Sequence, residues 1–168
     1  MKDAFYVDKT MCANGWRRFA NHLIDSLVYY LIIFLIGVVA GLFSEYLGMD
    51  GMSVWISEMS GIGELVFTYS IMLLYYIFME SLTQKTLGKY ITGTIVVMED
   101  GSKPEINVIL LRSICRLIPF DGLTFIGEYS RGWHDSLAKS YVVDVNKYNA
   151  ALRLKNSFEE IGSDQINY

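Results

Sequence analysis

Two long apolar runs dominate the pattern of hydrophobic and polar positions along the chain. The first covers residues 23–43 and the second covers residues 65–82, and each contains a single charged residue. A helix needs about 20 such residues to cross roughly 30 Å of hydrocarbon. The pattern therefore predicts two transmembrane helices joined by a loop of residues 44–64.

The chain beyond the second run predicts a mixed structure at the membrane surface. Residues 90–97 are rich in β-branched side chains and are followed by Glu99, Asp100 and Gly101, which predicts a β-hairpin. Residues 105–118 carry apolar positions at helical spacing, with Arg112 and Arg116 four apart, which predicts an amphipathic helix in the headgroup region.

The C-terminal part adds three smaller expectations. Residues 117–127 are apolar but too short to cross a bilayer, which favours a re-entrant or buried segment. Residues 141–145 suit a further strand, and residues 147–168 form a polar cytoplasmic tail of partly helical character. The predicted fold class is thus an α-helical integral membrane protein with a membrane domain over residues 1–146 and a tail over residues 147–168.

The distribution of cations predicts the orientation. From Phe19 to Gln84 the chain runs 66 residues without Lys or Arg, and the loop 44–64 holds four acidic residues and no cation. Lysines and arginines occur before the first run and again after the second. Because short cytoplasmic loops carry the excess of Lys and Arg, we expect both termini in the cytoplasm and residues 44–64 outside.

Several function classes find no support in the motifs. The sequence lacks the zinc-protease, nucleophile-elbow and dinucleotide-binding patterns, and the pair Gly88-Lys89 lacks the spacing of a phosphate loop. Cys12 and Cys115 have no partner at metal-ligand spacing. We therefore expect no enzyme activity, cofactor, metal site or nucleic-acid partner.

Asp25, about one turn inside the first apolar run, is the main candidate for a functional residue. A carboxylate at mid-bilayer costs about 2.5 to 3.5 kcal/mol on insertion scales, and such residues are functional candidates by default. Arg18, His22 and Asp25 fall on one helical face.

Two interpretations of Asp25 remain open. In the structural one, the carboxylate pairs with an arginine and fixes the first helix against the surface helix; the candidates are Arg18, Arg112, Arg116 and Arg131. In the functional one, Asp25 and Asp135, with an arginine near both, bind a cation or move protons.

Three further ionisable residues have a simpler interpretation. Glu80 lies about one turn before Lys85 and Lys89, so we expect it to snorkel to the interface and Lys89 to meet anionic headgroups. His134 lies beside Asp135, but adjacent residues on one helix do not face each other, which argues against an acid/base pair.

These residues together resemble a known family. The chain has GWRRFANHLID at 15–25, TLGK at 86–89, VVMEDGSKPE at 96–105, Arg112, and RGWHDSLA at 131–138. It is similar to the RDD family, named for one arginine and two aspartates, over roughly residues 14–145. The resemblance implies that Arg18, Asp25 and Asp135 are the name-giving residues. The third hydrophobic segment is shorter here than in many members, and LAKS at 137–140 departs from the family's usual small residue followed by Thr.

Two functions fit these observations. The first is a small-ion or proton-coupled transporter that acts as an oligomer through Asp25, because two helices alone cannot enclose a pathway; some family members have been proposed as cation/proton exchangers. The alternative is a non-transporting scaffold that recruits partner proteins on the cytoplasmic face. We expect the plasma membrane of a bacterium as the location, with the lipid bilayer, further copies of the chain and unidentified proteins as partners.

Overall fold

The computed structural model describes residues 5–118 and 132–164 and is mostly helical. The elements follow one another along the chain as a short 3₁₀ helix η1 (Lys9–Met11), α1 (Gly15–Leu47), α2 (Gly51–Ser57), α3 (Gly61–Thr83), α4 (Leu87–Thr92), β1 (Thr94–Met98), α5 (Ile106–Cys115), α6 (Trp133–Leu137), β2 (Ser140–Asp144) and α7 (Val145–Asp164).

Helices α1 and α3 contain the two apolar runs, as the sequence predicts, and extend beyond them at both ends. Asn14 begins α1, with its side-chain oxygen accepting a hydrogen bond from the Trp16 amide at 3.1 Å. Gly48 ends it in a left-handed conformation with φ of 62°. A helix of 33 residues is about 50 Å long, so α1 is longer than the hydrocarbon thickness of a bilayer.

The apolar surfaces of both helices are largely uncovered. Only 11% of the most apolar stretch of α1 and 17% of that of α3 are buried within the chain. A core helix of a soluble protein would be mostly buried, so these two surfaces require an apolar solvent or further helices around them. Among the described residues, α1 and α3 are the two helices long and apolar enough to cross a membrane.

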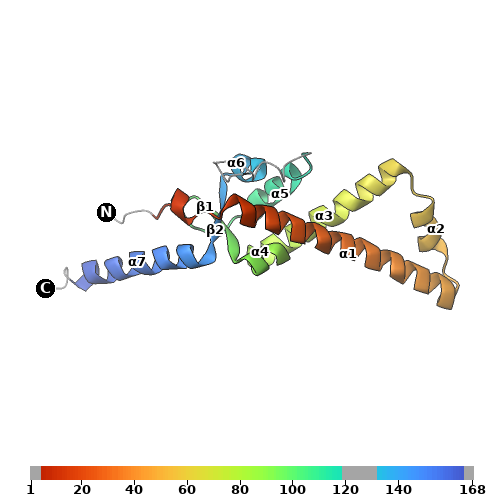
Figure 1. The fold of residues 1–168 in the computed structure, drawn as a ribbon, viewed down its shortest axis with the longest axis horizontal. Helices are drawn as coiled ribbons and strands as arrows, with labels where there is room; N and C mark the ends of the chain where they lie inside the picture. The colour runs from red at the N-terminus through yellow and green to blue at the C-terminus, as the bar shows by residue number, and fades with distance from the viewer. Residues whose placement is uncertain (1–4, 119–131, 165–168) are drawn as a thin grey trace.

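The two helices meet at one end and diverge toward α2 (Figure 1). Where they meet, Tyr29 of α1 packs with Met72, Tyr75 and Tyr76 of α3 in a small buried cluster. At the opposite end of the molecule from α2 lie η1, the sheet and α7 (Figure 1). The chain thus has an apolar, open end and a packed, polar end.

Strands β1 and β2 form an antiparallel pair, with Thr94 opposite Asp144 and Met98 opposite Ser140. The predicted hairpin is therefore wrong. A turn does follow β1, with Gly101 at φ of 78°, but the chain continues from it into α5 and the partner strand comes after α6. Pro104 has no N–H to donate to a ladder, whereas residues 140–144 are rich in β-branched side chains.

The predicted strand at residues 141–145 is thus confirmed with a shift of one residue, as β2. The N-terminal segment covers the sheet: the Val7 amide donates to the Glu99 carbonyl at 2.8 Å, and the Ala13 amide donates to the Val142 carbonyl at 2.9 Å. Residues 90–92 belong to α4, which Gly93 ends with φ of 69°. The first residues of the β-branched run are therefore helical.

The predicted surface helix is present as α5, but its orientation differs from the expectation. Arg112 is fully buried and Arg116 is largely buried against the protein, while the exposed face carries Ile106, Leu110, Leu111 and Ile114. The arginines therefore cannot reach headgroups. Of the segment 117–127, only residues 117 and 118 are described, so the expectation of a re-entrant or buried turn lies outside the described residues.

The C-terminal segment is helical, in agreement with the partly helical tail that the sequence predicts. Two backbone amides at the start of α7, those of Asn146 and Lys147, donate to the Asp144 carboxylate. Tyr148 fastens α7 to the turn after β1 through a 2.7 Å hydrogen bond from its hydroxyl to the Gly101 carbonyl. Helix α7 then runs away from α1 and α3 (Figure 1).

Candidate functional site

Asp25 is buried at the junction of three helices. Its Oδ1 accepts hydrogen bonds from the Tyr75 hydroxyl and the Gly88 amide, both at 2.8 Å, and its Oδ2 accepts one from the Thr86 hydroxyl at 2.6 Å. Thr86 is the N-cap of α4, and its Oγ1 accepts a hydrogen bond from the Lys89 amide at 3.4 Å. The carboxylate of α1 therefore holds both α3 and the first turn of α4.

The close approach of α4 to α1 explains the glycine in TLGK. A Cβ at Gly88 would lie 2.5 Å from the Asn21 carbonyl oxygen and 3.0 Å from Asp25 Oδ1. A side chain at this position would push α4 away from the carboxylate. Gly88 is therefore a packing residue of the site.

None of the candidate arginines that the structure describes forms the ion pair with Asp25 that the structural interpretation predicts. In the described part of the chain, Arg18, Arg112 and Arg116 form ion pairs with other carboxylates. The fourth candidate, Arg131, lies outside the described residues. Three hydrogen-bond donors, all of them uncharged groups, take the place of the arginine around Asp25.

Asp135 of α6 is the carboxylate that pairs with the arginines. Arg18 of α1 reaches its Oδ2 and Arg112 of α5 reaches its Oδ1, and Arg112 also donates to the Ser140 hydroxyl on β2. Both partners of Asp135 are buried, and the Asp135 side chain has no exposed surface. This arrangement joins α1, α5, α6 and β2 at one carboxylate.

Glu80 near the end of α3 is a second centre of ion pairing. Its carboxylate lies 2.8 Å from Lys89 Nζ, 3.1 Å from Arg112 Nε and 2.7 Å from Arg116 Nη2. The guanidinium carbon of Arg116 also lies 3.8 Å above the ring of Tyr76. The expectations that Glu80 snorkels and that Lys89 meets headgroups are wrong, because the two side chains pair with each other. The cations around Glu80 compensate its carboxylate for the loss of water.

Arg112 connects the two centres into one buried charge network. The network consists of Arg18, Glu80, Lys89, Arg112, Arg116 and Asp135. It joins one end of each of the two long apolar helices, α1 and α3, to α4, α5 and α6. Breaking a buried ion pair by removing one partner typically costs about 3 to 5 kcal/mol, so the network is a strong constraint on the packing.

Burial lowers the pKa of Lys89, a member of the network, and of His134 beside it. Desolvation lowers the pKa of Lys89 to about 8; Glu80 opposes this effect, and Arg116 adds to it. Desolvation and the nearby Arg116, Arg112 and Arg18 hold the pKa of His134 well below its ordinary value. His134 Nε2 lies 3.4 Å from Asp135 Oδ1, closer than expected for adjacent residues, but the imidazole is neutral at neutral pH.

A small polar cavity lies beside the network. Its volume is about 20 Å³, enough for about one species of the size of a water molecule. The described residues that line it come from α1, α4, α6 and β2 and from the end of α5: Arg18, Asn21, His22, Asp25, Lys89, Arg116, His134 and Val142. Six of these eight side chains are ionisable.

Nine of the ten charged or imidazole residues singled out in the sequence are brought together here; Arg131 is the one outside the described residues. Sequence reasoning missed the uncharged partners Tyr75, Thr86 and Ser140. Thr86 could have been found, because a Thr before an apolar residue and a short helical stretch is an N-cap signal. Tyr75 and Ser140 carry no such local signal.

The fold and the site define a class: a protein with two candidate membrane helices whose ends, on one side, are locked by a buried network of arginines and carboxylates. A comparison with protein families gives the group within this class. The RDD family matches residues 12–140, a range that includes Arg18, Asp25 and Asp135, and the chain belongs to this family. Searches of curated proteins and of solved structures give no match.

Proposed function

We propose that this RDD family protein is an integral membrane protein that transports a small ion, with proton coupling, as an oligomer. The observation that carries the proposal is the cavity at the base of the two apolar helices. Six ionisable side chains contributed by several elements surround a space for about one small species. Intramembrane or juxtamembrane groups of this kind typically mark ion or proton pathways.

Lys89 is the residue that would couple protons to the ion. Lys89 is one of the residues that line the cavity, and its pKa of about 8 lets its side chain gain or lose a proton near physiological pH. Asp25 contributes through position, because its hydrogen bonds to Thr86 and Gly88 hold the helix that carries Lys89. Asp25 therefore acts in this proposal together with α4 rather than as an isolated carboxylate.

The uncovered surfaces of α1 and α3 support the oligomer. Two helices cannot surround a pathway, and most of their apolar surface has no covering within the chain. Gly37 and Gly41 of α1 are four residues apart, and a Cβ at either would meet no atom within 4 Å. Small residues at this spacing allow a neighbouring helix to approach closely.

The proposed location is the plasma membrane of a bacterium, with both termini in the cytoplasm. The cations near both termini and the cation-free segment 44–64 support this orientation. The arrangement in which η1 and α7 lie opposite α2 supports it as well (Figure 1). In this orientation the charge network lies at the cytoplasmic end of the membrane helices.

The proposal is tested by ion flux in proteoliposomes that contain the full chain. Sodium, potassium, chloride and proton movements are followed separately, against empty liposomes. We expect flux in at least one of these assays and its loss in Asp25→Asn, because the neutral amide weakens the attachment of α4. Glu45→Gln, an exposed acid on α1, is the matched control and should behave as the wild type. Wild-type flux equal to that of empty liposomes would contradict the proposal.

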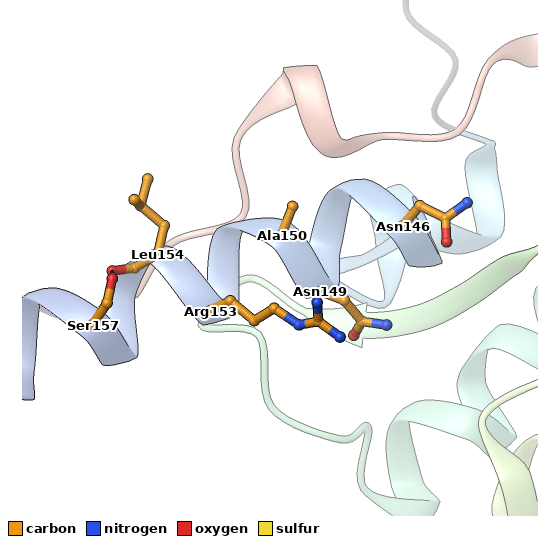
Figure 2. A pocket seen from close by; sticks show the side chains of 6 residues that line it. All are labelled: Asn146, Asn149, Ala150, Arg153, Leu154 and Ser157. Atoms are coloured by element: carbon orange, nitrogen blue, oxygen red, sulfur yellow. Dashed lines mark hydrogen bonds between the residues drawn. The ribbon is translucent and has the colours of Figure 1, made fainter.

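A specific observation favours the scaffold as a second candidate function. Helix α7 projects from the body of the molecule (Figure 1). Figure 2 shows Asn146, Ala150 and Leu154 along this helix, and Leu154 and Phe158 are 58% and 65% exposed. In crosslinking from native membranes, a partner held by this helix should be lost in Leu154→Asn and kept in Asn156→Asp.

A further inference from the structure

The cavity beside the charge network has a lining whose sign indicates its ligand. Among the described residues that line it, three are cations, namely Arg18, Lys89 and Arg116, and one is a carboxylate, that of Asp25. Both oxygens of that carboxylate already accept hydrogen bonds from the donors of α3 and α4 described above. The lining therefore offers mainly donors and positive charge to whatever occupies the space.

Lys89 supplies an independent observation. Lys89 is 3% exposed, and its ammonium has one hydrogen-bond acceptor among the described residues, Glu80 Oε1 at 2.8 Å. An ammonium carries three N–H donors, and buried donors without acceptors are costly. Because Lys89 lines the cavity, an acceptor in the cavity would satisfy the remaining donors.

We propose that the cavity binds one monatomic anion of the size of chloride, held by Lys89 together with Arg18 and Arg116. The volume of about 20 Å³ is enough for about one species of the size of a water molecule. This inference names the class of ion for the transport function proposed above. The biological role of the bound anion rests on that proposed function. Binding itself is measured without transport, so the two proposals can fail separately.

Anion binding at this site takes up a proton when Lys89 is neutral. The groups that face Lys89 from the packed elements are Asp25, Arg18 and His22 of α1, Glu80 of α3, Arg112 and Arg116 at α5, and His134 of α6. A bound anion favours the ammonium over the neutral amine. Because the pKa of Lys89 is about 8, binding should weaken as the pH rises above that value.

The experiment uses the purified full chain in nanodiscs and measures chlorine NMR line broadening in sodium chloride. Sodium gluconate keeps the ionic strength constant. We expect broadening that bromide reverses and sulfate leaves unchanged, and a dissociation constant about tenfold weaker at about pH 9 than at about pH 7. The pH series is repeated in His22→Asn, so that the second imidazole of the lining does not contribute.

Two variants locate the anion. Lys89→Met removes the ammonium and should weaken binding about tenfold or more, since a hydrogen bond to a charged group is lost. Lys85→Met is the matched control, because Lys85 lies over the Tyr90 ring and does not line the cavity. Val142→Ile fills the cavity with one methylene and leaves every charge in place, so it should weaken binding as well.

Three outcomes would overturn the inference. The first is wild-type protein without halide-specific broadening, even when the flux assay shows transport. The second is broadening that survives unchanged in both Lys89→Met and Val142→Ile. The third is binding of sulfate as tight as that of chloride. If halide binding is found and flux is absent, the anion site stands and the transport function fails.

Discussion

Two adjacent arginines at the start of α1 show that the contribution of an ion pair to stability depends on its burial. Arg18 is buried and pairs with the buried Asp135, whereas the side chain of Arg17 is 51% exposed and pairs with Asp144. Surface ion pairs contribute about 0 to 1 kcal/mol, but the loss of one partner of a buried pair costs about 3 to 5 kcal/mol. The sequence RR gives no indication of this difference.

This contrast gives a prediction with its control next to it in the chain. Arg18→Gln should lower the free energy of unfolding by about 3 to 5 kcal/mol, because Asp135 keeps its burial and loses one of its two arginines. Arg17→Gln should lower it by less than about 1 kcal/mol. Denaturant unfolding in detergent measures both values. Equal losses in the two variants would show that the Arg18 pair is not the constraint described here.

At the residue scale, the candidate site could largely be recognised from the sequence, but its pairing could not. Charged residues in or beside apolar runs are unusual enough to stand out, which is why Asp25 and Glu80 were found. Their partners depend on tertiary packing: Arg18 meets Asp135 across more than 100 positions. The sequence therefore left Arg18 as one of four candidate partners of Asp25, whereas in the structure Arg18 pairs with Asp135 and Asp25 accepts hydrogen bonds from uncharged groups.

At the scale of elements, the two long helices were predicted and the sheet was only half predicted. Helix periodicity and hydrophobic length are local signals, so α1 and α3 could be predicted from their own residues. The turn after β1 is also a local signal, and it is present. Which strand pairs with β1 is not local, because β2 follows two further helices, and a turn signal alone favoured the hairpin.

The packing of α3, α4 and α5 around Glu80 predicts an unusual pH dependence. The pKa of Lys89 is lowered from 10.5 to about 8 on folding, so between these values the unfolded chain binds more protons than the folded one. Stability therefore rises with pH across that window. A lysine whose pKa was raised by its partner would give the opposite slope.

The measurement is the free energy of unfolding from about pH 8 to about pH 10.5, in gluconate so that halide binding does not contribute. Wild-type protein should gain stability over this range, and Lys89→Met should be flatter. Lys85→Met, which changes a lysine four positions earlier outside the network, should keep the wild-type slope. A wild-type slope that falls with pH and matches that of Lys89→Met would contradict the burial of a titrating Lys89.

At the scale of the whole molecule, the chain consists of an open apolar end and a packed charged end. The apolar end has little cover within the chain, and the charged end carries the sheet, the network and α7 (Figure 1). In the membrane arrangement proposed above, hydrocarbon surrounds α1 and α3, and water or headgroups surround the rest. The same proposal predicts that α2 and the turn after β1 lie on opposite sides of the membrane.

This division is tested by labelling single cysteines with a membrane-impermeant thiol reagent in intact cells. The parent protein carries Cys12→Ser and Cys115→Ser, which removes the native thiols. Ser57→Cys in α2 should react from outside, because residues 44–64 are cation-free and lie at the open end. Ser102→Cys, in the exposed turn after β1, should react only after the cells are opened. Labelling of both in intact cells would remove the two-span arrangement, and the reverse pattern would invert it and place the charge network at the outer face, where the cytoplasmic pH could not reach Lys89.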